Sequence, residues 1–283
     1  MSNTTDTSPA LRRREGDCIY FGEYPQRLKS AEVAVTGERD GSGYYLGSDG
    51  RRYARVVATP KGEGYLFTDG TPVVAGEEYY FLVEELRWRV LTEEEGTLLL
   101  SSEYIIANMA YQSACQGDRC APAVVAGEGV YANNYKYSEV RGWLLDTFLS
   151  AAFSQEELDM IAVTEVDNGH DTVAIAPNRY ICENTEDKVF LLSYADLTSE
   201  DYGLPSGKLG AKQVSDYARA TGAFASMTGV SAGTGFWWTR TPKNDSGAHA
   251  LSVTNNATYS KTMASVHTAN IGIAPSLRIK LRG

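Results

Sequence analysis

The residues of this chain best suited to binding chemistry are small polar side chains concentrated between Lys243 and Asn270. In this interval 22 of the 28 residues are Ala, Asn, Ser, Thr, Asp, His, Tyr or Gly, so large apolar side chains are almost absent. A core segment does not have this composition, and an ordinary solvated loop carries more Lys, Glu and Pro. The interval therefore predicts a recognition surface that offers many hydrogen-bonding groups to a partner.

The predicted contact residues carry hydroxyl, amide, carboxylate, imidazole or phenol groups. They are Thr239, Thr241, Asn244, Asp245, Ser246, His249, Asn255, Asn256, Thr258, Tyr259, Ser260, His267 and Asn270. The residues predicted to form a fixed scaffold between and beside them are Trp237, Trp238, Arg240, Pro242, Ala250, Val253, Val266 and Pro275. Neighbouring residues of a strand point to opposite faces, and we expect both Trp237 and Trp238 to anchor the core. We expect Arg240 to join this segment to an acidic neighbour.

Residues that suggest a metal site or a catalytic centre are few. Cys115 and Cys120 form a C-x4-C pair, which is compatible with free thiols, with a small disulfide or with half of a metal site. His170 lies in a segment that partly resembles a calcium loop, but the distal Glu is missing and a polar turn is the simpler interpretation. We interpret His249 and His267 as surface contacts rather than as a metal pair. Because a Gly-x-Ser-x-Gly elbow and a P-loop are also missing, we expect no enzymatic activity, no cofactor and no metal.

The overall composition limits the class of partner. The chain has 283 residues, of which 43% are hydrophobic, and it carries a net charge of −10. It is long enough to bury a substantial core, but a nucleic-acid-binding protein needs a basic face that neutralises phosphates. The bias toward tyrosine, with 18 Tyr against 8 Phe, suits a binding surface. We therefore expect a protein or a cell-surface ligand as the partner, and no nucleic acid.

The sequence shows no signal for export or for membrane insertion. Residues 1–15 contain no apolar run, and we expect them to form a disordered tail. An uninterrupted apolar stretch of the roughly 18–20 residues that span a bilayer is also missing. We expect no membrane insertion, and the compartment stays open.

Turn signals and apolar patterns predict strands in the first hundred residues. Residues 44–81 read as a run of β segments, in which Asp49–Gly50 and Asp69–Gly70 mark tight turns. Residues 86–101 are predicted to form a further hairpin around the acidic turn Glu93–Glu95, because the flanking segments alternate or run apolar.

The predicted helices lie in the middle of the chain. Residues 138–149 place apolar side chains three or four apart, and Ser154–Glu157 is a capping-box pattern that begins another helix. A strand over 187–193 and a short helix over 212–221, ended by a glycine, follow. With a strand over 17–26 near the N-terminus, the pattern indicates an α+β fold of short antiparallel strands and two or three helices, in which the N- and C-terminal strands pair.

Several short blocks of the sequence occur in a fairly specific order. They are Tyr20–Gln26, Arg87–Leu91, Val140–Leu144, Lys188–Ser193, Trp237–Pro242 and Pro275–Ile279. In this order they resemble a large family of bacterial and phage domains (DUF6273-like) that have a C-type-lectin-like fold. The resemblance implies a single lectin-like domain over residues 16–283, with a β-rich insertion at about 30–85 and a variable-looking binding segment at about 237–272.

Some members of that family are the variable proteins of diversity-generating retroelements, whose C-terminal segment is hypermutated at adenine positions. Mutation of the adenines of Asn codons gives chiefly Asn, Ser, Thr, Tyr, His, Asp, Ala, Gly and Val, and these types fill much of residues 243–270. The resemblance therefore implies a non-enzymatic, receptor-type protein that displays a diversified surface on a lectin-like scaffold. The alternative is an invariant lectin-like binding or accessory domain.

Two activities found on this fold are not implied. Formylglycine-generating oxidases hold copper through a Cys pair near the C-terminal region, whereas Cys115 and Cys120 lie well before it. Calcium-dependent lectins bind sugar through a Glu-Pro-Asn or Gln-Pro-Asp loop and a Trp-Asn-Asp strand, and neither motif occurs here. The likeness in fold therefore brings neither oxidase chemistry nor calcium-dependent sugar binding.

Overall fold

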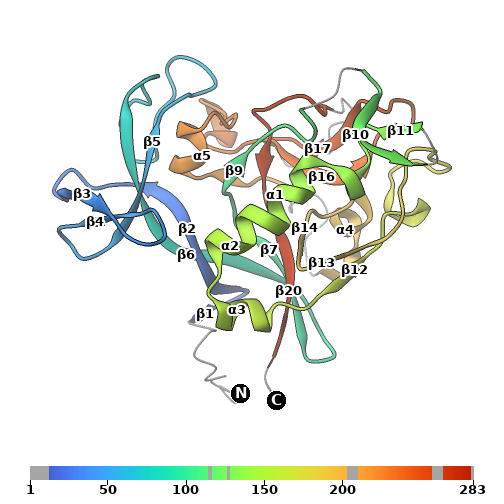
Figure 1. Ribbon diagram of the computed structural model, residues 1–283, viewed down its shortest axis with the longest axis horizontal. Coiled ribbons are helices and arrows are strands. Elements are labelled where there is room, and N and C mark those ends of the chain that lie inside the picture. The colour runs from blue at the N-terminus through green and yellow to red at the C-terminus, as the bar shows by residue number, and fades with distance from the viewer. Residues whose placement is uncertain (1–12, 114–116, 126–127, 203–209, 257–263, 282–283) are drawn as a thin grey trace.

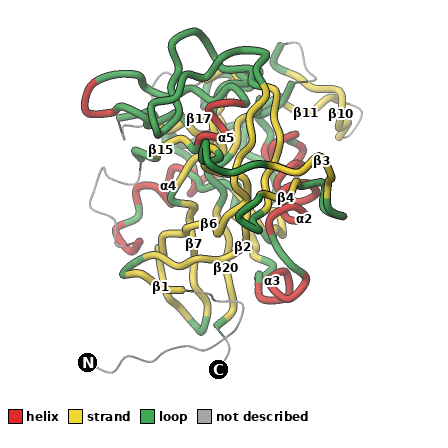
Figure 2. Tube along the Cα trace, turned by 90° about the vertical axis from the view of Figure 1, so that its left-hand side faces the viewer, coloured by secondary structure: helices red, strands yellow, loops and turns green. Residues whose placement is uncertain are grey.

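The computed structural model describes residues 13–113, 117–125, 128–202, 210–256 and 264–281. Over these residues the chain is a mixed α/β protein, mostly strands in antiparallel sheets with a few short helices, as predicted. A nine-stranded sheet and a five-stranded sheet organise it. Figures 1 and 2 show β7 and β20 of the larger sheet in the lower part of the molecule, and β17 of the smaller sheet in the upper part.

The nine-stranded sheet has the order β14-β20-β7-β6-β5-β4-β3, with β2 pairing β6 and β1 pairing β2. Its strands are β1 (Arg13–Glu15), β2 (Cys18–Leu28), β3 (Val35–Arg39), β4 (Tyr45–Gly47), β5 (Arg52–Val57), β6 (Glu78–Glu94), β7 (Thr97–Ser102), β14 (Val189–Phe190) and β20 (Ser276–Lys280). The 17-residue strand β6 pairs with β5 at its start and with β7 at its end. It therefore links the outlying strands β3–β5 to the centre of the sheet (Figure 1).

The N- and C-terminal strands share this sheet but do not pair, so the predicted pairing is wrong. β2 pairs with β6, whereas β20 pairs with β7 and β14, and the β6–β7 hairpin separates them. The reason is the apolar character of β7, in which Leu98, Leu99 and Leu100 are at most 2% exposed. A strand this apolar is most stable with partners on both of its edges and cover on both of its faces.

The turns predicted from sequence are present. Glu95 and Gly96 have φ values of 48° and 72°, which is the geometry of a two-residue hairpin turn that matches strand twist, and they close the β6–β7 hairpin. Gly50, with φ of 76°, lies in the turn between β4 and β5, and Gly70, with φ of 89°, turns the chain between Phe67 and Thr71.

The five-stranded sheet has the order β18-β17-β16-β19-β9. Its strands are β9 (Ala107–Asn108), β16 (Trp237–Pro242), β17 (His249–Val253), β18 (Ala264–Ser265) and β19 (Gly272–Ile273). Every residue of β16 is buried, so this strand is covered on both faces. Much of the segment that the sequence predicted as a binding surface therefore belongs to the strands of this sheet and to the loop between β16 and β17.

The predicted helix over 138–149 is a continuous helical run with a π turn at its centre. The helices are α1 (Glu139–Trp143), the π turn (Leu144–Phe148), α2 (Leu149–Ala152), α3 (Gln155–Met160), α4 (Tyr194–Thr198) and α5 (Asp216–Ala220), with 3-10 turns at Tyr135–Tyr137, His170–Thr172, Glu200–Tyr202 and Gly229–Ser231. Both sides of the capping box between Ser154 and Glu157 are formed, which confirms the predicted start of α3.

Aromatic side chains pack this helical run against the larger sheet. Phe148 lies 5.5 Å from Tyr24 and 5.7 Å from Phe153, and Phe153 lies 5.3 Å from Phe21, between ring centroids. Phe153 also stacks on Trp88 of β6 at 6.4 Å. This cluster fixes the helices across strands β2 and β6.

The remaining strands form small pairs. They are β8 (Tyr104–Ile105) with β15 (Gln213–Val214), β10 (Arg119–Val125) with β11 (Glu128–Tyr131), and β12 (Thr164–Val166) with β13 (Thr185–Asp187). At the N-terminus, Arg13–Glu15 form β1 against β2, so this part of the predicted tail is ordered in the sheet, while residues 1–12 lie outside the described residues. No helix in the described part of the chain is both long enough and apolar enough to cross a membrane.

Candidate ligand-binding surface and pockets

The two tryptophans of β16 anchor the C-terminal segment, as predicted. Trp237 and Trp238 are both 0% exposed. The Nε1–H of Trp237 donates to the Gly210 carbonyl at 2.9 Å, and that of Trp238 donates to the Met109 carbonyl at 2.9 Å. Each indole nitrogen is therefore satisfied inside the protein, which positions the strand precisely.

Arg240 joins the same strand to an acidic neighbour, as predicted. Its Nη1 donates to Asp196 Oδ2 at 2.5 Å and to the Leu191 carbonyl at 2.8 Å, and its side chain is 6% exposed. Burial opposes ionisation of Asp196, but the Arg240 charge and the hydrogen bonds from Ser193 lower the pKa of this carboxyl. Arg240 thus has a structural role, and it does not face a partner.

Thr239 and Thr241 do not lie on the surface, which corrects the prediction for these two residues. They are 0% and 1% exposed. Thr239 Oγ1 donates to the Leu251 carbonyl at 2.8 Å, and Thr241 Oγ1 accepts a hydrogen bond from the backbone N–H of Tyr194 at 2.8 Å. Because both faces of β16 are covered, the alternation of side chains along the strand exposes none of them.

The loop after β16 holds three of the predicted contact residues, and a fourth begins the next strand. Asn244 and Ser246 are partly exposed and Asp245 is exposed, and His249 follows at the start of β17. Ser246 Oγ lies 2.8 Å from His249 Nδ1. The side-chain amide of Asn133 donates to the carbonyls of Ser246 and His249, both at 2.9 Å. Asn133 thus anchors the backbone at both ends of the Ser246–His249 turn, while Asp245 is exposed to solvent.

His267 lies beside this loop because β18 brings it there. His249 pairs with Ser265, and the backbone N–H of Val266 donates to the Ala248 carbonyl at 3.0 Å. His267 Nδ1 lies 2.8 Å from the Gln112 carbonyl, so Nδ1 carries the proton, and Nε2 is buried with no hydrogen-bond partner among the described residues. Both ring nitrogens therefore face the interior, which corrects the prediction of His267 as a polar surface contact. We call Asn244, Asp245, Ser246, His249 and His267 the loop patch.

The other predicted residues are not part of the loop patch. Asn255 and Asn256 follow the opposite end of β17, where Val253 pairs with Trp237, and the Asn255 carbonyl accepts from Thr234 Oγ1 at 2.6 Å. Asn270 is partly exposed near β19. Thr258, Tyr259 and Ser260 lie outside the described residues, as does Cys115. The predicted set is thus divided between the two ends of the β16–β17 hairpin.

The histidines of the loop patch do not form a metal pair with a third ligand. No group of three or more His, Cys, Asp or Glu side chains that could hold a metal ion occurs in the described residues. Cys18 is a buried free thiol and Cys182 is a partly buried one. Burial raises the pKa of Cys182, which keeps this thiol protonated and weakly nucleophilic.

A pocket that the sequence did not predict borders the loop patch. It has a volume of about 470 Å³, and we call it the arginine–tyrosine pocket after Arg119, Tyr131 and Arg179 in its lining. The Arg119 guanidinium carbon lies 4.5 Å from the ring centroid of Tyr131, and that of Arg179 lies 4.9 Å from the centroid of Tyr180. The Tyr131 and Tyr180 rings are 4.6 Å apart. Stacking thus holds two cations in place at this rim.

Tyr131 connects this pocket to the loop patch. A Cβ atom on Gly247 would lie 2.6 Å from the Tyr131 ring and 2.8 Å from the Asp118 carbonyl, so glycine is required for the loop to approach this closely. No local sequence signal brings Arg119, Tyr131 and Arg179 together, because they come from the β10–β11 hairpin and from a distant loop.

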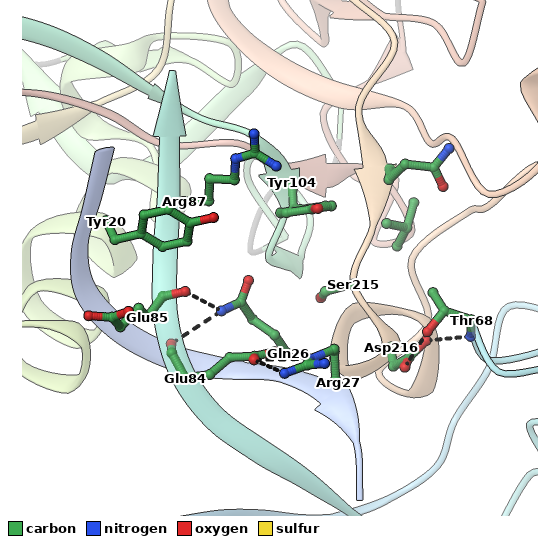
Figure 3. A pocket seen from close by; sticks show the side chains of 12 residues that line it. Tyr20, Gln26, Arg27, Thr68, Glu84, Glu85, Arg87, Tyr104, Ser215 and Asp216 are labelled. Atoms are coloured by element: carbon green, nitrogen blue, oxygen red, sulfur yellow. Dashed lines mark hydrogen bonds and ion pairs between the residues drawn. The ribbon is translucent and has the colours of Figure 1, made fainter. Parts of the chain in front are cut away.

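A second pocket lies between the larger sheet and the segment that begins α5. It has a volume of about 480 Å³, and we call it the central pocket. Figure 3 shows Tyr20, Arg87 and Tyr104 on one side of it, and Gln26 with the Arg27–Glu84 pair on the other. Ser215 and Asp216 close a third side (Figure 3).

Two charged side chains of the central pocket, Arg27 and Asp216, already have partners within the protein. Arg27 contacts Glu84 through Nε at 2.8 and 3.0 Å and through Nη2 at 2.5 Å. Asp216 accepts from the backbone N–H and the hydroxyl of Thr68 at 2.7 and 2.9 Å, and from the backbone N–H of Leu28 at 3.0 Å. These contacts fix the walls of the pocket.

Comparison with known proteins places the chain in a family. No curated protein and no solved structure matches it. The model of a family described as "Domain of unknown function (DUF6273)" matches residues 95–281, which is about two thirds of the chain. The match covers β7 to β20, whereas β1 to β6 precede it. The chain belongs to the DUF6273 family, and to this family model it adds an N-terminal extension of strands.

Proposed function

We propose that the protein is a non-enzymatic, receptor-type binding protein that recognises a protein or cell-surface ligand through its C-terminal loops. The observation that carries this proposal is the contrast between β16 and the loop patch. β16 is buried at every position and bonded to distant segments, whereas in the loop that follows it Asp245 is exposed and Asn244 and Ser246 are partly exposed. Such an arrangement lets side chains change without changing the backbone that displays them.

The arginine–tyrosine pocket supports the same proposal. Tyrosine and arginine are the residues most often found as energetic anchors of interfaces, and here Tyr131 packs against the Gly247 loop. A partner seated on the loop patch would reach this pocket with one side chain. The contact in this pocket would then involve the aromatic rings and guanidinium groups of the protein. The hydrogen-bonding side chains of the loop patch would surround it.

We further propose that the scaffold is lectin-like and that the protein is the variable protein of a diversity-generating retroelement. Burial of the predicted scaffold residues supports this: Trp237, Trp238, Arg240, Pro242, Ala250, Val253, Val266 and Pro275 are all buried. Most of the described polar positions between them are at least partly exposed. Diversification confined to exposed positions would change the ligand and preserve the fold.

The test is deep sequencing of this locus across many cells of one culture, with codons 243–270 compared with codons 140–200. We expect substitutions to concentrate at adenine-containing codons of the loop positions, with codons 237–242 and the upstream control silent. A uniformly quiet locus with no template repeat beside a reverse-transcriptase gene contradicts diversification. The invariant lectin-like binding domain would then replace it as the function.

A binding test addresses the receptor role separately. A display library with codons 244, 245, 246 and 249 randomised should yield variants that bind an arbitrary protein target and keep the cooperative unfolding of the parent. Codon 267 stays fixed, because both ring nitrogens of His267 face the interior. A matched library that randomises exposed positions on β3 should yield far fewer binders. Equal yields from the two libraries would show that the loop patch has no special capacity for recognition.

A further inference from the structure

Among the described residues, two polar atoms of the central pocket lack a hydrogen-bond partner, the side-chain oxygen of Gln26 and Nε of Arg87. Gln26 is 7% exposed, and its Nε2 donates to the carbonyls of Glu84 at 3.2 Å and Glu85 at 3.0 Å. Both partners are carbonyl oxygens, so the side-chain atom that contacts them is the amide nitrogen. The amide oxygen, Oε1, therefore faces the pocket. In Figure 3 this oxygen points toward the space below Arg87 and Tyr104, and it accepts no hydrogen bond from the described residues.

Arg87 is the second such group. It lines the pocket from β6, and within the described residues no carboxylate lies at ion-pair distance from its guanidinium. Its Nε is buried and has no hydrogen-bond partner among the described residues. Its polar neighbours are the thiol of Cys18, a weak acceptor, the phenol of Tyr20 and, at longer range, the carboxylate of Glu103, which is paired with Arg89. By contrast, Arg27 in the same pocket is fully engaged by Glu84. A half-buried guanidinium that has no ion pair within the described part of the chain is suited to bind a carboxylate or a related anion.

The charges of the lining decide which carboxylates fit. Three carboxyl groups line the pocket, those of Glu84, Glu85 and Asp216, against the two guanidiniums of Arg27 and Arg87. This excess of negative charge disfavours a ligand with a net negative charge and favours one that also carries a cation. The cationic group belongs near Gln26 Oε1, which is an acceptor.

We propose that the central pocket binds a free α-amino acid, with its carboxylate on Arg87, its ammonium group on Gln26 Oε1 and its side chain between Tyr20 and Tyr104. The volume of about 480 Å³ is within the usual range for small-molecule sites. The site is separate from the loop patch, so this proposal does not rest on the receptor function.

The family match gives the pocket a further property. Tyr20, Gln26 and Arg87 come from the N-terminal strands that precede the matched region, whereas Tyr104 and Ser215 lie within it. The pocket therefore forms where the extension meets the family domain. Both groups that contact the polar ends of the ligand come from the extension.

The test is ligand-observed NMR of the full chain with each proteinogenic L-amino acid, followed by calorimetry of those that bind. For the best ligand we expect its carboxamide, which lacks the carboxylate, and its des-amino analogue each to lose at least about tenfold in affinity. Arg87→Gln should reduce the affinity for the amino acid by a similar factor, and it should remove the difference between the amino acid and its carboxamide.

Arg55→Gln is the matched control. Arg55 lies on β5, pairs with Glu78 at 3.2 Å and does not line the pocket, so its variant should bind as the wild type does. Arg87→Lys, which keeps the charge, serves if Arg87→Gln does not fold. The proposal is overturned if no amino acid binds, if a dicarboxylate or the α-hydroxy acid binds more tightly than the amino acid, or if neither Arg87 variant changes the affinity.

Discussion

Arg240 Nη1 lies 2.5 Å from Asp196 Oδ2, and this buried ion pair ties β16 to the first turn of α4. Asp196 also accepts hydrogen bonds from the N–H and hydroxyl of Ser193, at 2.7 and 2.9 Å, as part of a capping box. One contact thus connects the scaffold of the predicted binding segment to a helix about 44 residues earlier in the chain.

Arg240→Met should therefore destabilise the fold by about 3–5 kcal/mol, because it leaves the Asp196 carboxylate buried without its cation. Asp196→Asn combined with Arg240→Met should recover part of this loss. Urea unfolding monitored by tryptophan fluorescence measures both variants. If the double variant is no more stable than Arg240→Met, the unpaired Asp196 carboxylate is not the cause of the loss.

The burial of Thr239 predicts that a substitution there destabilises the fold more than a substitution at Asn244, although both residues were expected at the surface. Thr239→Asn should cost about 1–3 kcal/mol, because a larger polar group must fit in a closed space beside the Leu251 carbonyl. Asn244→Thr should change stability by less than about 0.5 kcal/mol, since the residue is partly exposed in a loop. Thermal unfolding of the two variants measures the contrast, and similar melting temperatures would contradict the burial of Thr239.

Gly247→Ala should perturb the loop patch, because its Cβ would meet Tyr131 and a backbone carbonyl at less than 3.0 Å. We expect a loss of about 1–3 kcal/mol or a displaced loop. Gly142→Ala in α1 is the matched control: nothing lies within 4 Å of the added Cβ, and the helix should gain about 0.5–1 kcal/mol. Chemical denaturation of both variants tests the pair. Stabilisation by Gly247→Ala would show that the approach of Tyr131 is not this close.

Lys212 predicts an unusual dependence of stability on pH. Its side chain is 5% exposed, its Nζ contacts the Ser102 carbonyl and Ser101 Oγ, and burial lowers its pKa to about 8. The unfolded chain has a Lys pKa of about 10.4, so between pH 8 and about 10.4 the unfolded state binds more protons than the folded state. The contribution of Lys212 to the free energy of unfolding should therefore rise with pH through this window.

Urea unfolding at intervals from about pH 7.5 to 9.5 measures this rise, below the range in which unfolded Tyr ionises near pH 10. Lys212→Met should remove the rise, whereas Lys61→Met, at an exposed lysine, should keep it. A wild-type curve with the same slope as Lys212→Met would show that the buried ammonium is not destabilised.

The sequence by itself determined the features that depend on neighbours along the chain. The tight turn at Glu95–Gly96 and the capping box of Ser154 and Glu157 are local, because backbone conformation and hydrogen bonds within a few residues produce them. The apolar strand with Trp237 and Trp238 was predictable for the same reason. The helix predicted over 212–221 is correct only for Asp216–Ala220, because Gln213–Val214 pair with β8 as strand β15. Sequence composition also indicated which residues of the C-terminal segment form a scaffold.

Only the tertiary structure decided what depends on contacts distant in sequence. The strand order of the larger sheet was not predicted correctly. Pairing of β2 with β6 rather than with β20 depends on which strands require a partner on both edges. Thr239 was misplaced because the faces of β16 are closed by segments far from it. Gln26, Arg87 and Ser215 meet in one pocket only after β2, β6 and the start of α5 pack together, and no local pattern encodes that meeting. Local physics therefore predicts the elements, and long-range packing creates the candidate sites.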